Sequence, residues 1–331
     1  MKTAAIPPAP RRPTGTAFAA RPDARVPWSA GCVADASGAL AFVVTESEGL
    51  AGARLLLRRR GGAESGGGAE AGGGAEAGGG AEAGGGAEAG APGGEEVGSA
   101  DEVRGAEEVR LPFTGTRGGP LRAVLPGDLP LAEGFWEVHA EAPGHEPVRL
   151  RPGLDDLRAL VDRDPWGAAA VAVHLPYTSK YGNLALRAWL RAPHAEAGAV
   201  HVAPAETTVR GRCYGSAPTA AAYAELRPAD GEGEPVRAEL TGEGRDFRLR
   251  IAHAPLLAQG PRRWRVGLRP EGARGPDIRL ARLLDDLVDR HAVYTYPATA
   301  HEGLRVRPYY SSGNDFAVRV TPAAPAAERA D

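Results

Sequence analysis

One short pattern occurs twice in this chain. PYTSKYGNLALR occupies 176–187, and PYYSSGNDFAVR begins 132 residues later, at 308. A repeated turn followed by a similar strand-like run indicates a duplicated unit. The fold must therefore be one that roughly 115–135 residues can form, with a core of its own.

Other landmarks recur in the same order in both halves. They are Cys32 and Cys213, the runs 53–60 and 221–228, the runs 107–126 and 234–253, Trp136 and Trp264, and the segments 149–157 and 279–287. Short β-rich runs alternate with Gly/Pro turns at intervals of ~8–12 residues, which is typical of β-sandwiches. The sequence predicts an all-β protein made of two β-sandwich repeats in tandem.

The predicted boundaries follow from these landmarks. We expect a disordered tail over 1–25, repeat one over 26–205, repeat two over 206–321 and a second disordered tail over 322–331. Each repeat also contains a stretch with helical spacing. A short helix is therefore expected in each repeat, from the apolar residues Leu154, Leu157, Leu160 and Val161 in the first and Leu283, Leu284, Leu287 and Val288 in the second.

A glycine-rich segment interrupts repeat one over 61–103. The hexapeptide AEAGGG recurs there, and its glycines prevent a helix, while no apolar side chain is available to bury. The segment carries nine acidic residues and no Lys or Arg, so it contributes −9 to a chain of net charge −3 and leaves about +6 for the rest. We expect a disordered loop, either a tolerated expansion or an acidic tether that screens the basic surface.

Composition argues against several locations and partners. No apolar run approaches the ~18 residues that span a membrane, and the N-terminal stretch has no apolar secretory core, so a cytoplasmic protein is expected. The arginines at 58–60 lack interleaved aromatics, which argues against nucleic acid. No pattern predicts the oligomeric state.

No motif in the chain announces a reaction. Phosphate-binding loops, GxSxG elbows and metal-spaced His or Cys residues are absent from the sequence, so neither a cofactor nor a metal is expected. The pairs Asp155-Asp156 and Asp285-Asp286 are interpreted as solvent-facing acids in the first turn of each short helix. Cys32 and Cys213 are interpreted as buried small hydrophobes rather than a disulfide or nucleophiles.

Aromatic residues provide the candidate binding site. Trp136 and Trp264 lie in equivalent strands and are expected in the cores. Turn and edge positions are wetter, and exposed aromatics beside an Asn can stack on a sugar ring, although ordinary turn packing is the alternative. The candidate ligand contacts are Tyr177, Tyr181, Asn183, Trp189, Tyr309, Tyr310 and Asn314.

The two units, each ending in a PY turn, a Gly-Asn and a strand of the NLALR type, resemble tandem immunoglobulin-like accessory segments of actinobacterial wall-teichoic-acid-type glycosyltransferases. The resemblance covers about 26–321. It implies two immunoglobulin-like sandwiches that act beside a catalytic domain in assembly or polymer contact. No strand followed by an acidic DxD, which would hold a metal–nucleotide complex in that domain, occurs here, so no catalytic residue is carried over.

Three functions are compatible with these observations. The first is a non-catalytic binding or assembly module of a cell-envelope glycosyltransferase system, contacting an anionic glycan or a partner transferase. The second is a small glycosyl- or polyol-phosphate-type transferase with an unrecognised site between the units. The third is a self-assembling scaffold.

Overall fold

The computed structural model describes residues 28–45, 48–61, 107–116, 119–161, 163–165, 167–168 and 170–323. The predicted disorder of 1–25, of 62–103 and of 324–331 lies outside these residues. The described part of the chain is almost entirely β, in three sheets, and contains no helix long and apolar enough to cross a membrane. The predicted C-terminal tail begins too early, because the last strand continues to Pro322.

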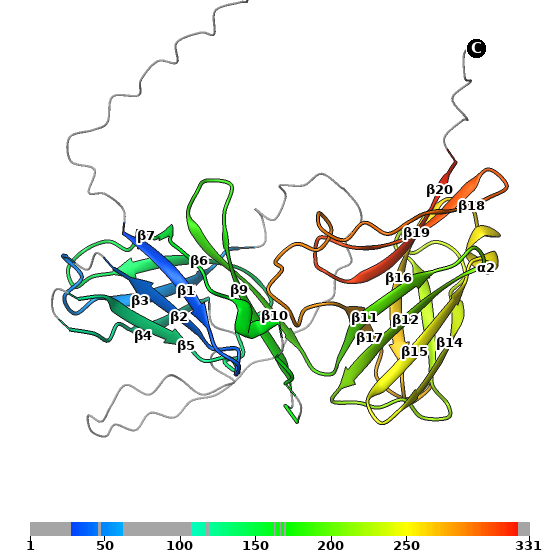
Figure 1. Ribbon diagram of the computed structural model, residues 1–331, viewed down its shortest axis with the longest axis horizontal. Coiled ribbons are helices and arrows are strands. Elements are labelled where there is room, and N and C mark those ends of the chain that lie inside the picture. Colours follow the sequence, from blue (N-terminus) through cyan, green and yellow to red (C-terminus); the bar gives the residue numbers. More distant parts are fainter. Residues whose placement is uncertain are drawn as a thin grey trace, which may run out of the picture.

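The first unit is built from two sheets (Figure 1). One has the order β5-β2-β1-β8, with β1 (Ser29–Ala34), β2 (Leu40–Val44), β5 (Leu121–Leu125) and β8 (Arg151–Pro152). The other has the order β4-β3-β6-β10-β9, with β3 (Arg54–Arg59), β4 (Glu108–Pro112), β6 (Gly134–Glu141), β9 (Val171–Thr178) and β10 (Leu184–Arg191), while β7 (Val148–Arg149) pairs with β6.

The second unit is one ten-stranded sheet of order β13-β14-β15-β12-β11-β17-β16-β20-β19-β18. Its strands are β11 (His194–Val202), β12 (Glu206–Tyr214), β13 (Tyr223–Pro228), β14 (Val236–Glu243), β15 (Asp246–Ala252), β16 (Arg262–Arg269), β17 (Ile278–Ala281), β18 (Thr299–His301), β19 (Leu304–Tyr310) and β20 (Phe316–Pro322). A further pairing of β13 with β16 closes seven of these strands into a barrel.

This closure corrects the prediction of two like sandwiches. In the second unit a two-residue turn at 244–245, with Gly244 at φ +59°, joins β14 directly to β15, so the two strands pair along their length. The equivalent strands β4 and β5 are separated by 113–120 and meet only at the isolated bridge between Thr114 and Arg122. A second break, at Leu150, divides the strand equivalent to β17 into β7, which pairs with β6, and β8, which pairs with β1. The two breaks together leave the first unit as two separate sheets.

Strand register confirms the duplication residue by residue. In the first unit Trp136, Leu186 and Pro176 lie opposite one another on β6, β10 and β9. In the second unit Trp264, Val318 and Pro308 lie opposite one another on β16, β20 and β19. Both tryptophans are fully buried, as expected from the sequence.

The prediction that Cys32 and Cys213 occupy equivalent positions, in contrast, was wrong. Cys32 lies on β1, which pairs antiparallel with β2 and parallel with β8. The strand with the same pairing in the second unit is β11, whereas Cys213 lies on β12. The predicted boundary between 205 and 206 therefore falls inside the β11–β12 hairpin, and the second sheet begins at His194. Both cysteines are buried and unpaired in the structure.

The two expected helices are also corrected. In the first unit only η1 (Arg158–Leu160) is helical, because hydrogen bonds to β1 hold the preceding residues extended through Asp156. In the second unit 283–288 is not helical, because the Leu287 N–H bonds the Asp285 carboxylate and the Arg290 N–H bonds the Asn314 side chain instead of the carbonyls four residues earlier. The short α2 (Ala254–Leu257) lies elsewhere.

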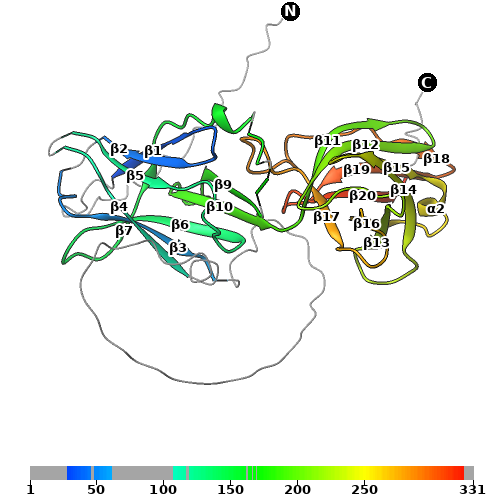
Figure 2. The same ribbon diagram turned by 90° about the horizontal axis from the view of Figure 1, so that it is seen from below.

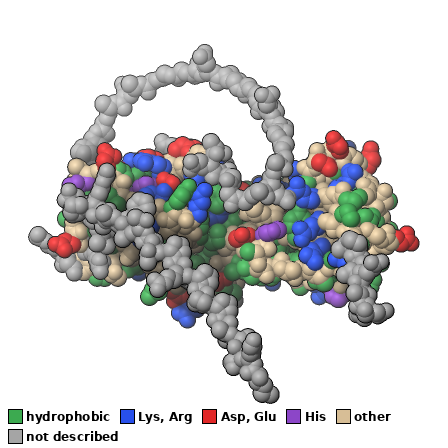
Figure 3. All heavy atoms as spheres, turned by 90° about the horizontal axis from the view of Figure 1, so that it is seen from above, with side chains coloured by type: hydrophobic (Ala, Val, Ile, Leu, Met, Phe, Trp, Pro, Cys, Tyr) green, Lys and Arg blue, Asp and Glu red, His purple; other side chains and the backbone are tan. Residues whose placement is uncertain are grey.

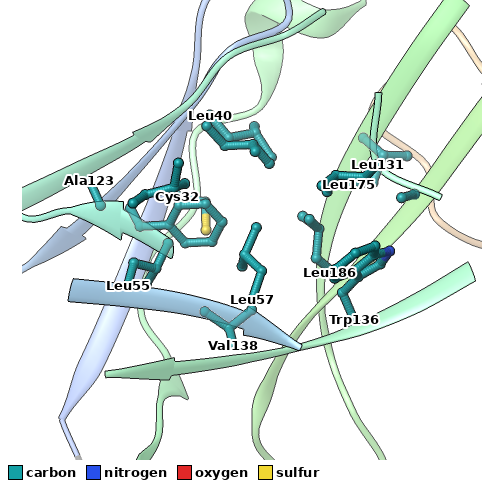
Figure 4. Packing of buried hydrophobic residues seen from close by; sticks show 14 of the residues in the cluster. Cys32, Leu40, Leu55, Leu57, Ala123, Leu131, Trp136, Val138, Leu175 and Leu186 are labelled. Atoms are coloured by element: carbon teal, nitrogen blue, oxygen red, sulfur yellow. The ribbon is translucent and has the colours of Figure 1, made fainter. Parts of the chain in front are cut away.

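The cores follow from alternation along the strands. In β15, Phe247, Leu249 and Ile251 are buried and the residues between them are exposed. Figure 4 shows the corresponding packing in the first unit, where Leu57, Val138 and other aliphatic side chains surround one another. Each unit thus has an apolar core made by the inner faces of its strands.

The two units are joined closely. Only Ala192 and Pro193 separate β10 from β11. The hydrophobic cluster of the first unit extends across this joint and includes Tyr214, Ala281 and Leu283 of the second. Figure 2 shows β9 and β10 on the side of the first unit that faces the second.

Candidate binding face

The repeated turn has the same geometry in both units. Ser179 and Ser311 each begin the turn, and each main-chain N–H bonds to a carbonyl four residues later. The left-handed position is Gly182 at φ +72° in the first turn and Asn314 at φ +64° in the second. The two Gly-Asn pairs are therefore offset by one residue, and Asn takes the place of Gly as it readily does at positive φ.

Three candidate contacts are buried, so the expectation that they are exposed is wrong. Trp189, Tyr310 and Asn314 are fully enclosed. The Trp189 indole donates to the Gly313 carbonyl at 3.2 Å, across the joint between the units. The Asn314 side chain accepts from the Arg290 main-chain N–H at 3.1 Å and donates to the Val288 carbonyl at 3.0 Å, so its polar groups are used internally.

The other four candidates reach the surface to different degrees. Tyr181 is 63% exposed, with the Lys180 ammonium 5.0 Å from the centre of its ring. Tyr177, Asn183 and Tyr309 are half-buried. The structure does not bring these four together, because Tyr181 and Asn183 belong to the first turn and Tyr309 to a strand of the second unit.

The outer sheet face of the first unit is used to hold the second. Phe135, Arg187 and Leu175 lie opposite one another on β6, β10 and β9, and directly paired residues point to the same face. One step along the strands, Trp189 lies opposite Val173. Leu175, Val173 and Trp189 are buried, and the Trp189 indole reaches the second unit at Gly313, so the part of this face around Trp189 is a joint and not a free surface.

The same face of the second unit is basic instead of apolar. Arg263, Arg319 and Arg307 occupy the positions of Phe135, Arg187 and Leu175. The neighbouring positions complete a surface that we call the arginine face, which consists of Arg263, Arg265, Arg305, Arg307 and Arg319 around Tyr309. Figure 3 shows basic side chains gathered on the second unit.

Four members of the arginine face, Arg265, Arg305, Arg307 and Arg319, form no ion pair with an acidic side chain of a described residue. Arg319 instead lies 5.4 Å from the centre of the Tyr309 ring, a cation–π contact. At the equivalent site of the first unit, by contrast, Glu137 bonds Arg149 at 2.5 Å and lies near Arg60.

Tyr309 remains a neutral hydrogen-bonding group on this face. Burial raises the pKa of its phenol, although Arg263 and Arg319 act in the opposite direction. At neutral pH the hydroxyl is therefore protonated and able to donate a hydrogen bond. The arginine face as a whole presents donors and positive charge, which suit anionic oxygens.

The sequence contained a signal for this face that the motif search missed. The run Leu304–Arg307 alternates apolar and arginine residues, as do Arg263–Val266 and Val318–Val320. Period-two alternation places such arginines on one side of a strand. The sequence alone does not show that the three strands are neighbours. That follows from the strand pairing around the repeated turn and Trp264.

Few groups among the described residues are candidates for metal binding or acid–base chemistry. The described residues hold no group of three or more His, Cys, Asp or Glu side chains that could bind a metal ion. The two carboxylates of the first Asp pair have different partners. Asp155 accepts the Cys32 main-chain N–H at 2.8 Å, and Asp156 pairs with Arg158. Asp285 is buried in an ion pair with Arg290, which corrects its expected exposure.

A cavity of about 410 Å³ lies where the units meet. It is lined by 167–168 of the first unit and by Cys213, Tyr214 and Arg245 of the second, among others. Arg245 forms a two-pronged ion pair with Asp164, at 2.6 and 2.8 Å. Burial raises the pKa of the Cys213 thiol to about 12, so the thiol stays protonated and is a poor nucleophile.

Comparisons with known proteins give only distant likenesses. No protein-family model matches the chain, and no curated protein matches it significantly. One match is a crystal structure of S. aureus TarS, a wall teichoic acid glycosyltransferase. It covers 40% of this chain and 25% of the TarS chain, at 11% identity and a TM-score of 0.32. The structure of TarS 217-571 matches 41% of this chain and 40% of its own, with the same identity and score.

A marsupial T cell receptor matches over 90% of this chain and 92% of its own, at 8% identity and a TM-score of 0.22. This chain thus spans less than half of either TarS structure, and all three TM-scores are low. At these scores the likenesses assign neither a fold nor a function.

Proposed function

We propose that this protein is a non-catalytic binding module that contacts an anionic glycan through the arginine face of its second unit. The observation that carries the proposal is the in-register pair of Arg319 and Arg307 on neighbouring strands. Like charges placed directly opposite in a sheet destabilise it. An anionic ligand that bridges the pair removes this repulsion, so the face is more stable occupied than empty.

A simpler interpretation of the arginine face is that it only keeps the end of the two-unit array soluble, as a polar cap. The last unit of a tandem array needs a polar outer surface to stay soluble, because no neighbour covers it. A cap, however, works equally well with mixed charges, as on β3, β4 and β6, where Arg110 pairs with Glu108 and Glu141. The single sign of the arginine face supports a ligand of opposite charge.

The proposal also includes the setting in which the module works. We place it in a cell-envelope glycosyltransferase system, in the cytoplasm, where it would hold polymer near a partner transferase. This part rests on the resemblance of the repeated turn and strand, and the test below addresses the glycan contact alone.

The contact is tested on immobilised heparin and polygalacturonate, two anionic glycans of different chemistry. Wild-type protein should be retained at low ionic strength and released as salt is added, because exposed charges are screened over about 10 Å at 0.1 M. The variant Arg305→Gln/Arg307→Gln should elute at clearly lower salt. Elution of this variant with the wild type would count against the arginine face.

The matched control removes two arginines that already have acidic partners. Arg227 pairs with Glu225, and Arg250 pairs with Glu206. Arg227→Gln/Arg250→Gln should elute with the wild type although its net charge falls equally. A third variant, Tyr177→Ala/Tyr309→Ala, asks whether the aromatics contribute. Equal retention of that variant would remove both tyrosines from the contact and leave the arginines.

A further inference from the structure

The two most exposed large apolar side chains among the described residues lie at one end of the first unit. Leu154 is 93% exposed and Tyr181 is 63% exposed. The Arg151 guanidinium bonds the Tyr181 and Gly182 carbonyls at 3.2 and 2.9 Å, so the turn and the segment after β8 are neighbours. We call the segment 153–157 together with the turn 179–183 the free end.

The second unit shows what the same end of the fold does. Leu284, the equivalent of Leu154, packs on the hydrophobic cluster of the first unit. Gly313, the equivalent of Tyr181, accepts the Trp189 indole N–H. This end is therefore an interface in the second unit, whereas no described residue covers it in the first unit. Its exposed leucine and tyrosine make an uncovered apolar patch.

The charges around the free end decide what fits there. They are of both signs. Asp156 already pairs with Arg158, and Arg151 donates to the Tyr181 and Gly182 carbonyls, which leaves the exposed side chains of Asp155 and Lys180. The arginine face of another molecule carries one sign only and would repel Lys180. Two free ends related by a two-fold axis can instead place Asp155 of one copy against Lys180 of the other, as an isologous contact requires.

We infer that two copies of this chain associate through their free ends, with Leu154 and Tyr181 of each copy packed against those of the other. This interaction goes beyond glycan binding and does not depend on it. The contact leaves both arginine faces open, so the dimer presents two of them. Two linked faces would hold a polymer more tightly than one.

The inference is tested by sedimentation equilibrium of the full-length protein over a range of concentrations, without glycan. Wild type should move from the 34.3 kDa mass of one chain toward twice that mass as concentration rises. Leu154→Glu should stay at the mass of one chain, and Tyr181→Ser should raise the dissociation constant by about tenfold or more, as expected for losing a central apolar contact.

Both variants change exposed side chains and should unfold at the same denaturant concentration as wild type when each is monomeric. Val293→Glu is the matched control, since Val293 is also 58% exposed but lies on the second unit. It should dimerise like wild type. A wild type that keeps the mass of one chain at every concentration, or a Leu154→Glu variant that associates normally, would overturn the inference whatever the glycan experiment shows.

Discussion

The indole N–H of Trp189 donates to the main-chain carbonyl of Gly313, 3.2 Å away and 124 residues later in the chain. This bond ties the last strand of the first unit to the turn between β19 and β20 of the second. It is accompanied by Arg191, which bonds Glu133 at 2.9 Å and Asp315 at 3.3 Å. The repeated turn of the second unit is thus part of the joint between the units.

Trp189→Phe should destabilise the protein, because it removes the N–H and leaves the Gly313 carbonyl without its donor. An unsatisfied buried group costs about 1–3 kcal/mol, so the midpoint of urea unfolding should fall accordingly. Val293→Ala, at an exposed position, should change stability by no more than about 0.5 kcal/mol. Equal midpoints for Trp189→Phe and wild type would show that the joint contributes little.

His174 should make the protein acid-sensitive. Burial, with a smaller contribution from Arg163, lowers the pKa of its imidazole to about 3. In the unfolded chain the pKa is about 6.5, so below that pH the unfolded state takes up a proton that the folded state does not. Stability is therefore lost as the pH falls from 6.5 toward 3, by roughly 4–5 kcal/mol in all for this group.

The measurement compares urea unfolding of wild type and His174→Val between pH 7 and pH 4. Val306 occupies the equivalent strand position in the second unit, so valine fits this place in the fold. The variant should lose less stability than wild type over this range, although His139 and His253, whose pKa values are also lowered by burial, keep some pH dependence. Parallel curves for the two proteins would contradict the assignment.

Arg307→Gln should stabilise the empty protein at low ionic strength. Arg307 lies directly opposite Arg319 in the sheet, and relief of such a like-charge pair is worth about 0.2–1 kcal/mol. The gain should shrink as salt is added, since the charges are partly exposed. Thermal unfolding at two salt concentrations checks this, with Arg250→Gln as a control that should not stabilise, because Arg250 has acidic partners.

Neither cysteine should react in the folded protein. Burial raises the pKa of the Cys213 thiol to about 12, and that of Cys32 is also raised, first by burial and then by Asp155. A thiol-labelling reagent at pH 8 should modify both only after denaturation, because the thiolate is the reactive form. Rapid labelling of native protein would mean that the joint opens readily.

The duplication and much of the strand content could be predicted from the sequence, because period-two alternation and the repeated turn are local patterns. The pairing that decides topology is not local. Cys32 and Cys213 look equivalent by their order in the chain, yet they lie on the first and second strands of their units. The helical spacing of 283–288 was likewise overridden by side chains, since Asp285 takes the Leu287 N–H and the distant Asn314 takes the Arg290 N–H.

The candidate site was predicted only in part, for two reasons. Trp189 bonds the other unit at the joint, which no local pattern states, and Tyr310 turns inward within its own unit among Tyr294, Tyr296 and Phe316. The arginines were visible as alternating residues, but no local pattern states that their three strands are adjacent.

The two-residue link between β10 and β11 limits how this protein can be divided. A shorter chain that stopped at Arg191 would open Trp189 and its apolar surroundings to water, and it would be prone to aggregate. The first unit therefore has to keep the second beside it if it is transplanted into another protein and is to remain in solution.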